Sequence, residues 1–164
     1  MARRARHRVR QFVGALRPRV TEADRAGAYA HLDEAQRRIF EAMTLRDQQH
    51  GIEVFRRVRA SAAGDRALLT AALLHDCGKG RVALWERVAF VVLNAAAPSL
   101  LRRVATAEGA PWRQALWRLL HHPELGAEAV AQAGGDPDVV RMIREQDAER
   151  PDARLALLQM ADEA

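Results

Sequence analysis

Residues 65–79 read DRALLTAALLHDCGK, and this stretch decides the fold that we expect. Its middle part, residues 67–74, is apolar almost all round, interrupted by a single threonine. A helix that is apolar on every side belongs in the middle of a bundle of helices. Asp65 is placed to cap the start of this helix, and Gly78 is placed to end it. The stretch therefore predicts a buried central helix over residues 66–77.

The sequence on either side of this stretch also predicts helices, and it lacks the alternation of apolar and polar residues that is typical of strands. The expected helices cover residues 21–32, 33–43, 45–60, 82–97, 99–107, 112–121, 124–133, 138–148 and 152–164. Pro111, Pro123, Pro137 and Pro151 each stand where a helix is expected to begin, which suits proline. Loops are short and no repeat is visible. The predicted fold is a single compact all-α bundle.

The size and composition are those of one globular domain, with 164 residues of which 49% are hydrophobic. No apolar run approaches the ~20 residues that span a bilayer, since the longest, residues 88–97, contains Asn94. The single cysteine, Cys77, excludes a disulfide within the chain and a cysteine-based zinc cluster. The basic start has no apolar segment typical of a secretory signal, so we expect a cytoplasmic protein.

Positive charge is concentrated at the start of the chain. Seven arginines precede the first acidic residue, Glu22, and without these seven the formal charge of +5 becomes −2. Apolar residues recur there at helical spacing: Ala5, Val9, Phe12, Val13 and Leu16. We expect residues 1–20 to form a basic amphipathic helix that packs on a body formed by residues 21–164. A contact of this helix with nucleic acid or with a membrane surface is the less favoured alternative.

His75 and Asp76 stand at the end of the predicted central helix, directly after its apolar run. Burying both without partners would cost several kcal/mol. A divalent metal would satisfy both, because imidazole and carboxylate groups are ordinary metal ligands. A direct His–Asp hydrogen bond is the alternative, although adjacent helical side chains point ~100° apart. His50 and Asp162 stand next to apolar faces of two other predicted helices and are further candidate ligands.

In chain order these residues are His50, His75-Asp76 and Asp162, which resembles the H…HD…D pattern of the HD-domain metal-dependent phosphohydrolases. Four strings of sequence are similar to motifs of that family: RDQQH at 46–50 to its first-histidine helix, LLHDCGK at 73–79 to LLHDIGK, HPELG at 122–126 to HPExG, and QMADEA at 159–164 to its terminal ligand helix. The matches span residues 46–164, which is most of the chain.

The resemblance implies a helical bundle of the HD-domain type that holds a divalent ion (Mn, Fe, Co, Ni, Zn or Mg). The expected ligands are His50, His75, Asp76 and Asp162, with His122 as a further ligand in members that bind two ions. Those members carry another histidine where this chain has Gln146, and their GYP string is missing here, so the resemblance does not support a cyclic-dinucleotide substrate. The activity implied is hydrolysis of a phosphomonoester or phosphodiester, in a nucleotide or small phosphorylated molecule, through a metal-bound water.

The same hypothesis assigns catalytic roles to Asp76, Lys79 and Arg46. Lys79 is the one lysine beside 25 arginines, and it follows Asp76 by three residues. The residues expected to bind substrate are Lys79, Arg46, Arg81 and His121. Glu53 and Glu124 remain alternative acids for the leaving group, and Trp85, Trp112 and Trp117 are expected in the core. The alternative function is a catalytically silent HD-type regulatory module that binds a metal or nucleotide and has an arginine-rich arm.

Overall fold

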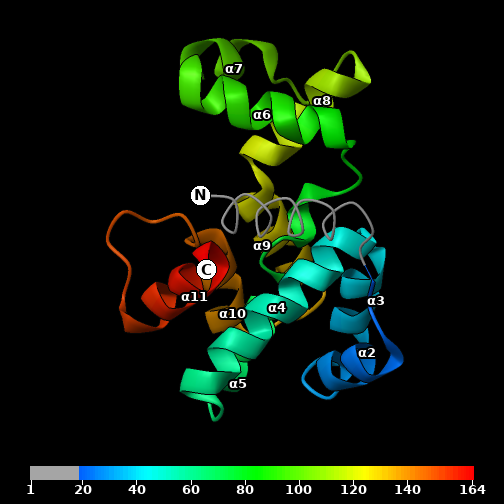
Figure 1. Cartoon of the computed structure of the whole chain (residues 1–164), viewed down its shortest axis with the longest axis vertical. Helices are drawn as coiled ribbons and strands as arrows, with labels where there is room; N and C mark the ends of the chain where they lie inside the picture. Colours follow the sequence, from blue (N-terminus) through cyan, green and yellow to red (C-terminus); the bar gives the residue numbers. More distant parts are fainter. Residues whose placement is uncertain (1–18) are drawn as a thin grey trace, which may run out of the picture.

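A computed structural model describes residues 19–164, so the predicted helix at residues 1–20 lies outside the described residues except for its last two positions. The described part forms ten α-helices and one 3-10 turn, without a strand, which confirms the predicted all-α bundle (Figure 1). The elements are α2 (Glu22–Tyr29), α3 (Glu34–Ala42), α4 (Leu45–Ala62), α5 (Arg66–Leu74), η1 (Cys77–Lys79), α6 (Leu84–Ala96), α7 (Pro98–Val104), α8 (Pro111–Leu120), α9 (His122–Gln132), α10 (Pro137–Arg144) and α11 (Ala153–Glu163).

Capping side chains fix several of the helix starts that the sequence predicts. The hydroxyl of Thr21 accepts a hydrogen bond from the backbone amide of Asp24, whose carboxylate in turn accepts one from the amide of Thr21. Asp33, Thr44 and Asp65 cap α3, α4 and α5 in the same position. Each cap satisfies an amide that has no partner inside its helix. The starts of these four helices are therefore determined locally, by residues next to them in the sequence.

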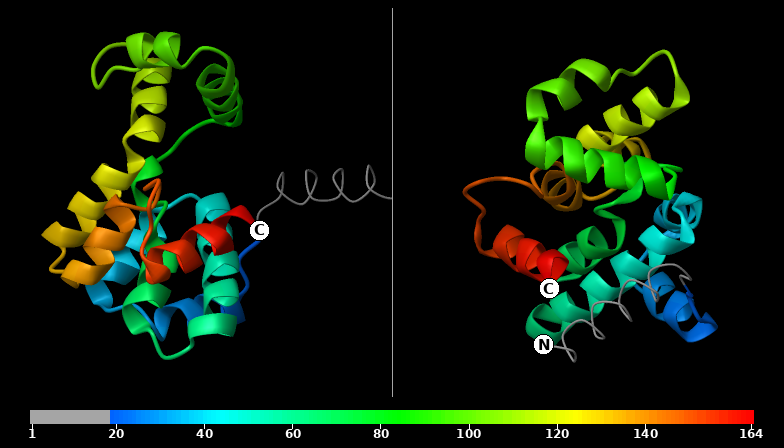
Figure 2. Two further views of the ribbon diagram at one scale, coloured as in Figure 1. Left: turned by 90° about the vertical axis from the view of Figure 1, so that its left-hand side faces the viewer. Right: turned by 45° about the horizontal axis from the view of Figure 1, so that its top comes forward.

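The central helix is α5, and residues 68–74 of it are all buried. Helix α4 runs beside it, α10 packs against it, and α3 and α11 complete the surrounding layer (Figures 1 and 2). Leucines of α5 form one buried cluster with Ile52 and Phe55 of α4, Ile143 of α10 and Leu158 of α11. This cluster is the core of the body and it confirms that residues 67–74 belong in the middle.

Helix α5 ends at Leu74, three residues before the predicted end, and residues 77–79 form the 3-10 turn η1. Gly78 is not the helix stop that the sequence predicts. A Cβ on Gly78 would overlap the carbonyl oxygen of His122 and would lie 2.6 Å from the amide nitrogen of Gly126. The glycine therefore lets η1 contact the backbone of α9, and the positive φ of 63° falls at Gly80 instead.

Helices α6, α7 and α8 form a separate unit at one end of the molecule, and we call residues 84–120 the α6–α8 unit (Figures 1 and 2). It has a small cluster of its own around Leu101 and Leu116. Trp117 packs against this cluster, but Trp85 and Trp112 are exposed, contrary to the prediction that all three tryptophans are in the core. Within the described residues, no helix combines the length and the apolar character needed to cross a bilayer.

Candidate metal centre

Four side chains from three separate parts of the chain meet beside the end of α5. His50 comes from the second turn of α4, His75 and Asp76 from the turn between α5 and η1, and Asp162 from the last turn of α11. The Nε2 atom of His50 lies 2.6 Å from Oδ1 of Asp162 and 4.0 Å from Oδ2 of Asp76. The Nε2 atom of His75 lies 3.3 Å from Asp162 Oδ1 and 3.4 Å from Asp76 Oδ1. All four residues predicted as ligands are therefore neighbours in space.

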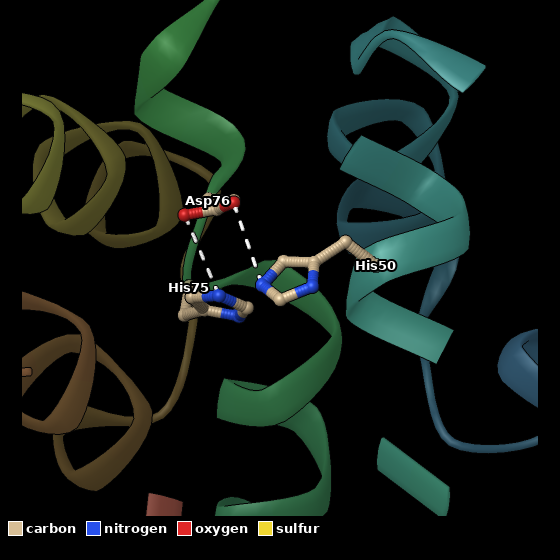
Figure 3. A group of neighbouring side chains, drawn as sticks. All are labelled: His50, His75 and Asp76. Atoms are coloured by element: carbon tan, nitrogen blue, oxygen red, sulfur yellow. Dashed lines mark ion pairs between the residues drawn. The ribbon is translucent and has the colours of Figure 1, made fainter. Parts of the chain in front are cut away.

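Figure 3 shows the rings of His50 and His75 on one side of the Asp76 carboxylate, reaching it from α4 and from the end of α5. His50, His75 and Asp76 each offer one nitrogen or oxygen atom, and these atoms lie within 4.8 Å of one another. Two imidazoles and a carboxylate at this spacing could hold one divalent cation.

Backbone hydrogen bonds fix how the histidines are oriented. The Nδ1 atom of His75 lies 3.0 Å from the carbonyl oxygen of Ala72, and Nδ1 of His122 lies 2.9 Å from that of Leu119. Because a carbonyl oxygen only accepts, each Nδ1 carries a proton and donates it, which leaves Nε2 directed at the carboxylates. The Nε2 atom of His75 is buried and makes no hydrogen bond in the described part of the chain. A buried polar atom without a partner is costly, so this nitrogen fits a ligand that accepts its lone pair.

The charges of the site favour a cation. Burial alone would raise the pKa of Asp76, but the nearby His75 and Lys79 outweigh burial and lower it to about 2. The pKa of Asp162 is also lowered, because the nearby His50 and His75 outweigh the effect of its burial. Burial acts to lower the pKa of His75, and the carboxylates of Asp76 and Asp162 reverse this and raise it. Both carboxylates therefore stay ionised and are available to a cation.

His122, the first residue of α9, also lies beside Asp76. Its Nε2 atom is 3.6 Å from Asp76 Oδ1, the same oxygen that His75 approaches. Its pKa is lowered, first by burial and then by the charge of Lys79, so the neutral ring that can bind a metal is favoured. The side-chain amide of Gln146 donates to the carbonyl oxygen of His75 at 3.1 Å. Its side chain supports the backbone of the site.

A cleft of about 300 Å³ opens beside His50 and Asp76, between α4, η1 and α6. Its charged side chains include Arg46, Glu53 and Lys79, all three of which the sequence singles out, together with Arg87 of α6. The Nζ atom of Lys79 lies 2.6 Å from Asp76 Oδ2, so its charge is held at the carboxylate.

Arg87 is a residue that the sequence reasoning missed. Its guanidinium lies 2.7 Å from Oδ2 of Asp47, a buried carboxylate that also accepts a hydrogen bond from the hydroxyl of Thr44. The sequence around Arg87 resembles no phosphate-binding motif, and one arginine among 25 carries little signal. Only the position of α6 in the fold, from which this side chain reaches Asp47 of α4, brings it to the cleft.

Other predicted residues lie elsewhere. Arg81 lines a different hollow, with Arg25 and Glu41. His121 ends α8 with its ring 4.9 Å from that of Trp117, and it is not among the residues that line the cleft. Glu124 is exposed on α9 and does not line the cleft either. The structure therefore brings Glu53, and not Glu124, next to the candidate metal centre.

No family model matches the chain, and no curated protein or solved structure resembles it significantly. The HD-domain interpretation therefore depends on the motifs quoted above and on the convergence of their side chains.

Proposed function

We propose that this protein is a divalent-metal-dependent phosphohydrolase that acts on a phosphomonoester or phosphodiester. The observation that carries the proposal is the convergence of the Nε2 atoms of His50 and His75 on the carboxylates of Asp76 and Asp162. These four residues would hold the ion, and His122 would be a further ligand on the α9 side of Asp76. When bound, a divalent ion supplies Lewis-acid chemistry, since it polarises a phosphoryl oxygen and makes water more acidic.

The cleft residues supply the remaining parts of the reaction. Arg46, Lys79 and Arg87 place three positive charges around the cleft, where they neutralise the phosphoryl oxygens of a bound ester. Asp47 holds the guanidinium of Arg87 in place by a buried ion pair, so little ordering is needed when substrate binds. Glu53 is the carboxyl group in the cleft that can carry a proton to the leaving group.

The lining of the cleft favours a small substrate. Its volume is about 300 Å³, and the described residues that line it include no tryptophan, tyrosine or phenylalanine on which a nucleobase could stack. Charged and amide side chains dominate instead. A compact phosphorylated molecule fits these properties better than a nucleotide does, although both belong to the proposed substrate class.

Metal binding and turnover test the proposal separately. Isothermal titration with Mn²⁺ measures binding, and p-nitrophenyl phosphate and its bis ester measure hydrolysis. His75→Ala is expected to abolish both, because it removes a proposed ligand. Arg46→Met is expected to keep the ion and to lose at least about tenfold in kcat/KM. Arg38→Met, which removes an exposed arginine that pairs with Glu34 on α3, is the matched control and should change neither.

Two outcomes would refute parts of the proposal. If His75→Ala binds Mn²⁺ as tightly as the native chain, the ion is held elsewhere and the proposed centre is wrong. If the native chain binds the ion but hydrolyses no phosphoester in a broad panel, the silent metal-binding module is the better description.

A further inference from the structure

Helix α6 has most of its large apolar residues on the outside. It reads LWERVAFVVLNAA and is as apolar as the central helix α5, yet its one buried residue is Glu86, while Phe90 and Leu93 are partly buried against the cluster around Leu101. The exposed fractions are 59% for Trp85, 55% for Val88, 65% for Val91 and 56% for Val92. A helix of this composition normally turns such residues into a core. The outer face of α6 is therefore made for contact with something apolar.

The exposed apolar residues gather in the α6–α8 unit. Of the nine large hydrophobic residues that are exposed in the described chain, seven belong to this unit: Leu84, Trp85, Val88, Val91, Val92, Leu100 and Trp112. The unit forms one end of the molecule, away from the core of the body (Figures 1 and 2). Exposed apolar residues concentrated in this way mark an interaction surface, whereas single exposed ones need no explanation.

The charge of the unit indicates what this surface meets. Residues 84–120 contain five arginines and two glutamates, a net charge of +3. The rest of the described chain has 15 basic and 19 acidic residues, a net charge of −4. A two-fold dimer through this unit would bring together two parts of the chain with the same positive net charge, which is unfavourable. The arginine-rich start of the chain is positive too, so an anionic surface is the better complement.

We propose that the α6–α8 unit docks on the surface of an anionic lipid bilayer. Trp85, Val88, Val91 and Val92 would enter the boundary between headgroups and acyl chains, where tryptophan is favoured because its ring is apolar and its N–H is polar. The exposed Arg102 and Arg103 of α7 would add attraction to anionic headgroups. The docking is peripheral, by an interfacial helix, and it is independent of the proposed hydrolysis.

Vesicle sedimentation of the full chain tests the proposal, with vesicles of phosphatidylcholine alone and with about a third phosphatidylglycerol. We expect binding to the anionic vesicles that weakens in high salt. The double variant Trp85→Gln/Val91→Gln leaves the charge unchanged and should bind at least about tenfold more weakly, because it removes two inserted apolar side chains. The control Leu45→Gln/Met160→Gln changes two exposed apolar residues outside the unit and should bind like the native chain.

Four outcomes would overturn the proposal. The first is no binding to anionic vesicles. The second is equal binding by the native chain and the α6 variant, which would assign lipid binding to the arginine-rich start alone. The third is a dimer, seen by sedimentation velocity, that the α6 substitutions dissociate, since a second copy would then cover the face. The fourth is a melting temperature that falls in the α6 variant and not in the control, since another part of the chain would then cover the apolar face of α6.

Discussion

Replacing Gly78 by alanine tests how the site is held together, because this glycine lies between Asp76 and Lys79 and against α9. A Cβ at this position would overlap the carbonyl oxygen of His122 and lie 2.6 Å from the amide nitrogen of Gly126. Both are backbone atoms, which cannot rotate away as a side chain can. From the other side, a Cβ on Gly126 would lie 3.2 Å from the amide nitrogen of Gly78. The two glycines together allow η1 and α9 to touch.

The size of the effect follows from these distances. Ordinary van der Waals contact begins at 3.4 Å, so even the 2.6 Å contact requires η1 and α9 to separate by about 0.8 Å. Overpacking a core costs about 1–3 kcal/mol when side chains can adjust. Because backbone meets backbone here, we expect a loss of about 3 kcal/mol in the free energy of unfolding. In a chain of this size that corresponds to a melting temperature lower by about 6–12 °C.

The same displacement should weaken the candidate metal centre. It would widen the 3.6 Å distance between His122 Nε2 and Asp76 Oδ1, so Mn²⁺ affinity measured by titration should fall together with stability. Gly27→Ala is the matched control. Gly27 lies exposed within α2 with nothing within 4 Å of its added Cβ, so alanine there should raise stability by up to about 1 kcal/mol. A Gly78→Ala variant that melts at or above the native temperature would refute the reasoning.

Three further predictions use other contacts. Asp65 caps α5 and binds Arg154 through both carboxylate oxygens, at 2.7 and 2.8 Å, and the hydrogen bonds from Arg154 lower its pKa below 3.8 in the folded chain. The contribution of the ionised Asp65 to the free energy of unfolding is therefore present above about pH 4 and is lost as the pH falls through the pKa of the folded state. Asp65→Asn should cost at most about 1 kcal/mol at pH 7 and progressively less in acid, by urea denaturation; a pH-independent difference would contradict this. Burial, with a smaller effect of Asp76, raises the pKa of the Cys77 thiol to about 12, so a thiol reagent at pH 8 should label the folded chain far more slowly than the urea-unfolded one, and equal rates would be evidence against burial. Lys79→Met should lower kcat/KM for a phosphomonoester at least about tenfold, because it removes a positive charge that neutralises the phosphoryl oxygens. Mn²⁺ binding should be kept, because the ammonium contacts Asp76 as a cation that competes with the metal. Full activity at limiting substrate would show that Lys79 has no role in binding phosphate.

Local signals in the sequence were sufficient for the helices and for much of the site. The cap at Asp65 and the apolar run after it need no knowledge of the rest of the chain, and both are confirmed. The four predicted ligands are brought together because they stand at the ends and faces of helices that share one core. Gly78 was assigned wrongly as a helix stop. A glycine is needed there because the backbone of α9, more than 40 residues away in sequence, lies against it.

What sequence reasoning could not supply depends on how separate helices are oriented. Arg87 reaches the cleft because α6 turns it toward Asp47, 40 residues earlier. The same orientation of α6 exposes Trp85, although composition alone favours burial of a tryptophan in such an apolar helix. In both cases the position of the side chain depends on how α6 is oriented in the fold, and the residue type alone does not predict it.

The contact between Gly78 and His122 also has a consequence for the architecture. The chain leaves the body after η1, builds the α6–α8 unit, and returns at α9, so exit and return are already in contact. A short turn could therefore connect η1 to α9 in place of the unit, and none of the proposed metal ligands lies within it. Among the described residues that line the cleft, Arg87 is the one that the unit contributes. Exchanging the unit would thus alter the cleft at Arg87 and the exposed apolar face of α6, and would leave the proposed metal ligands in place.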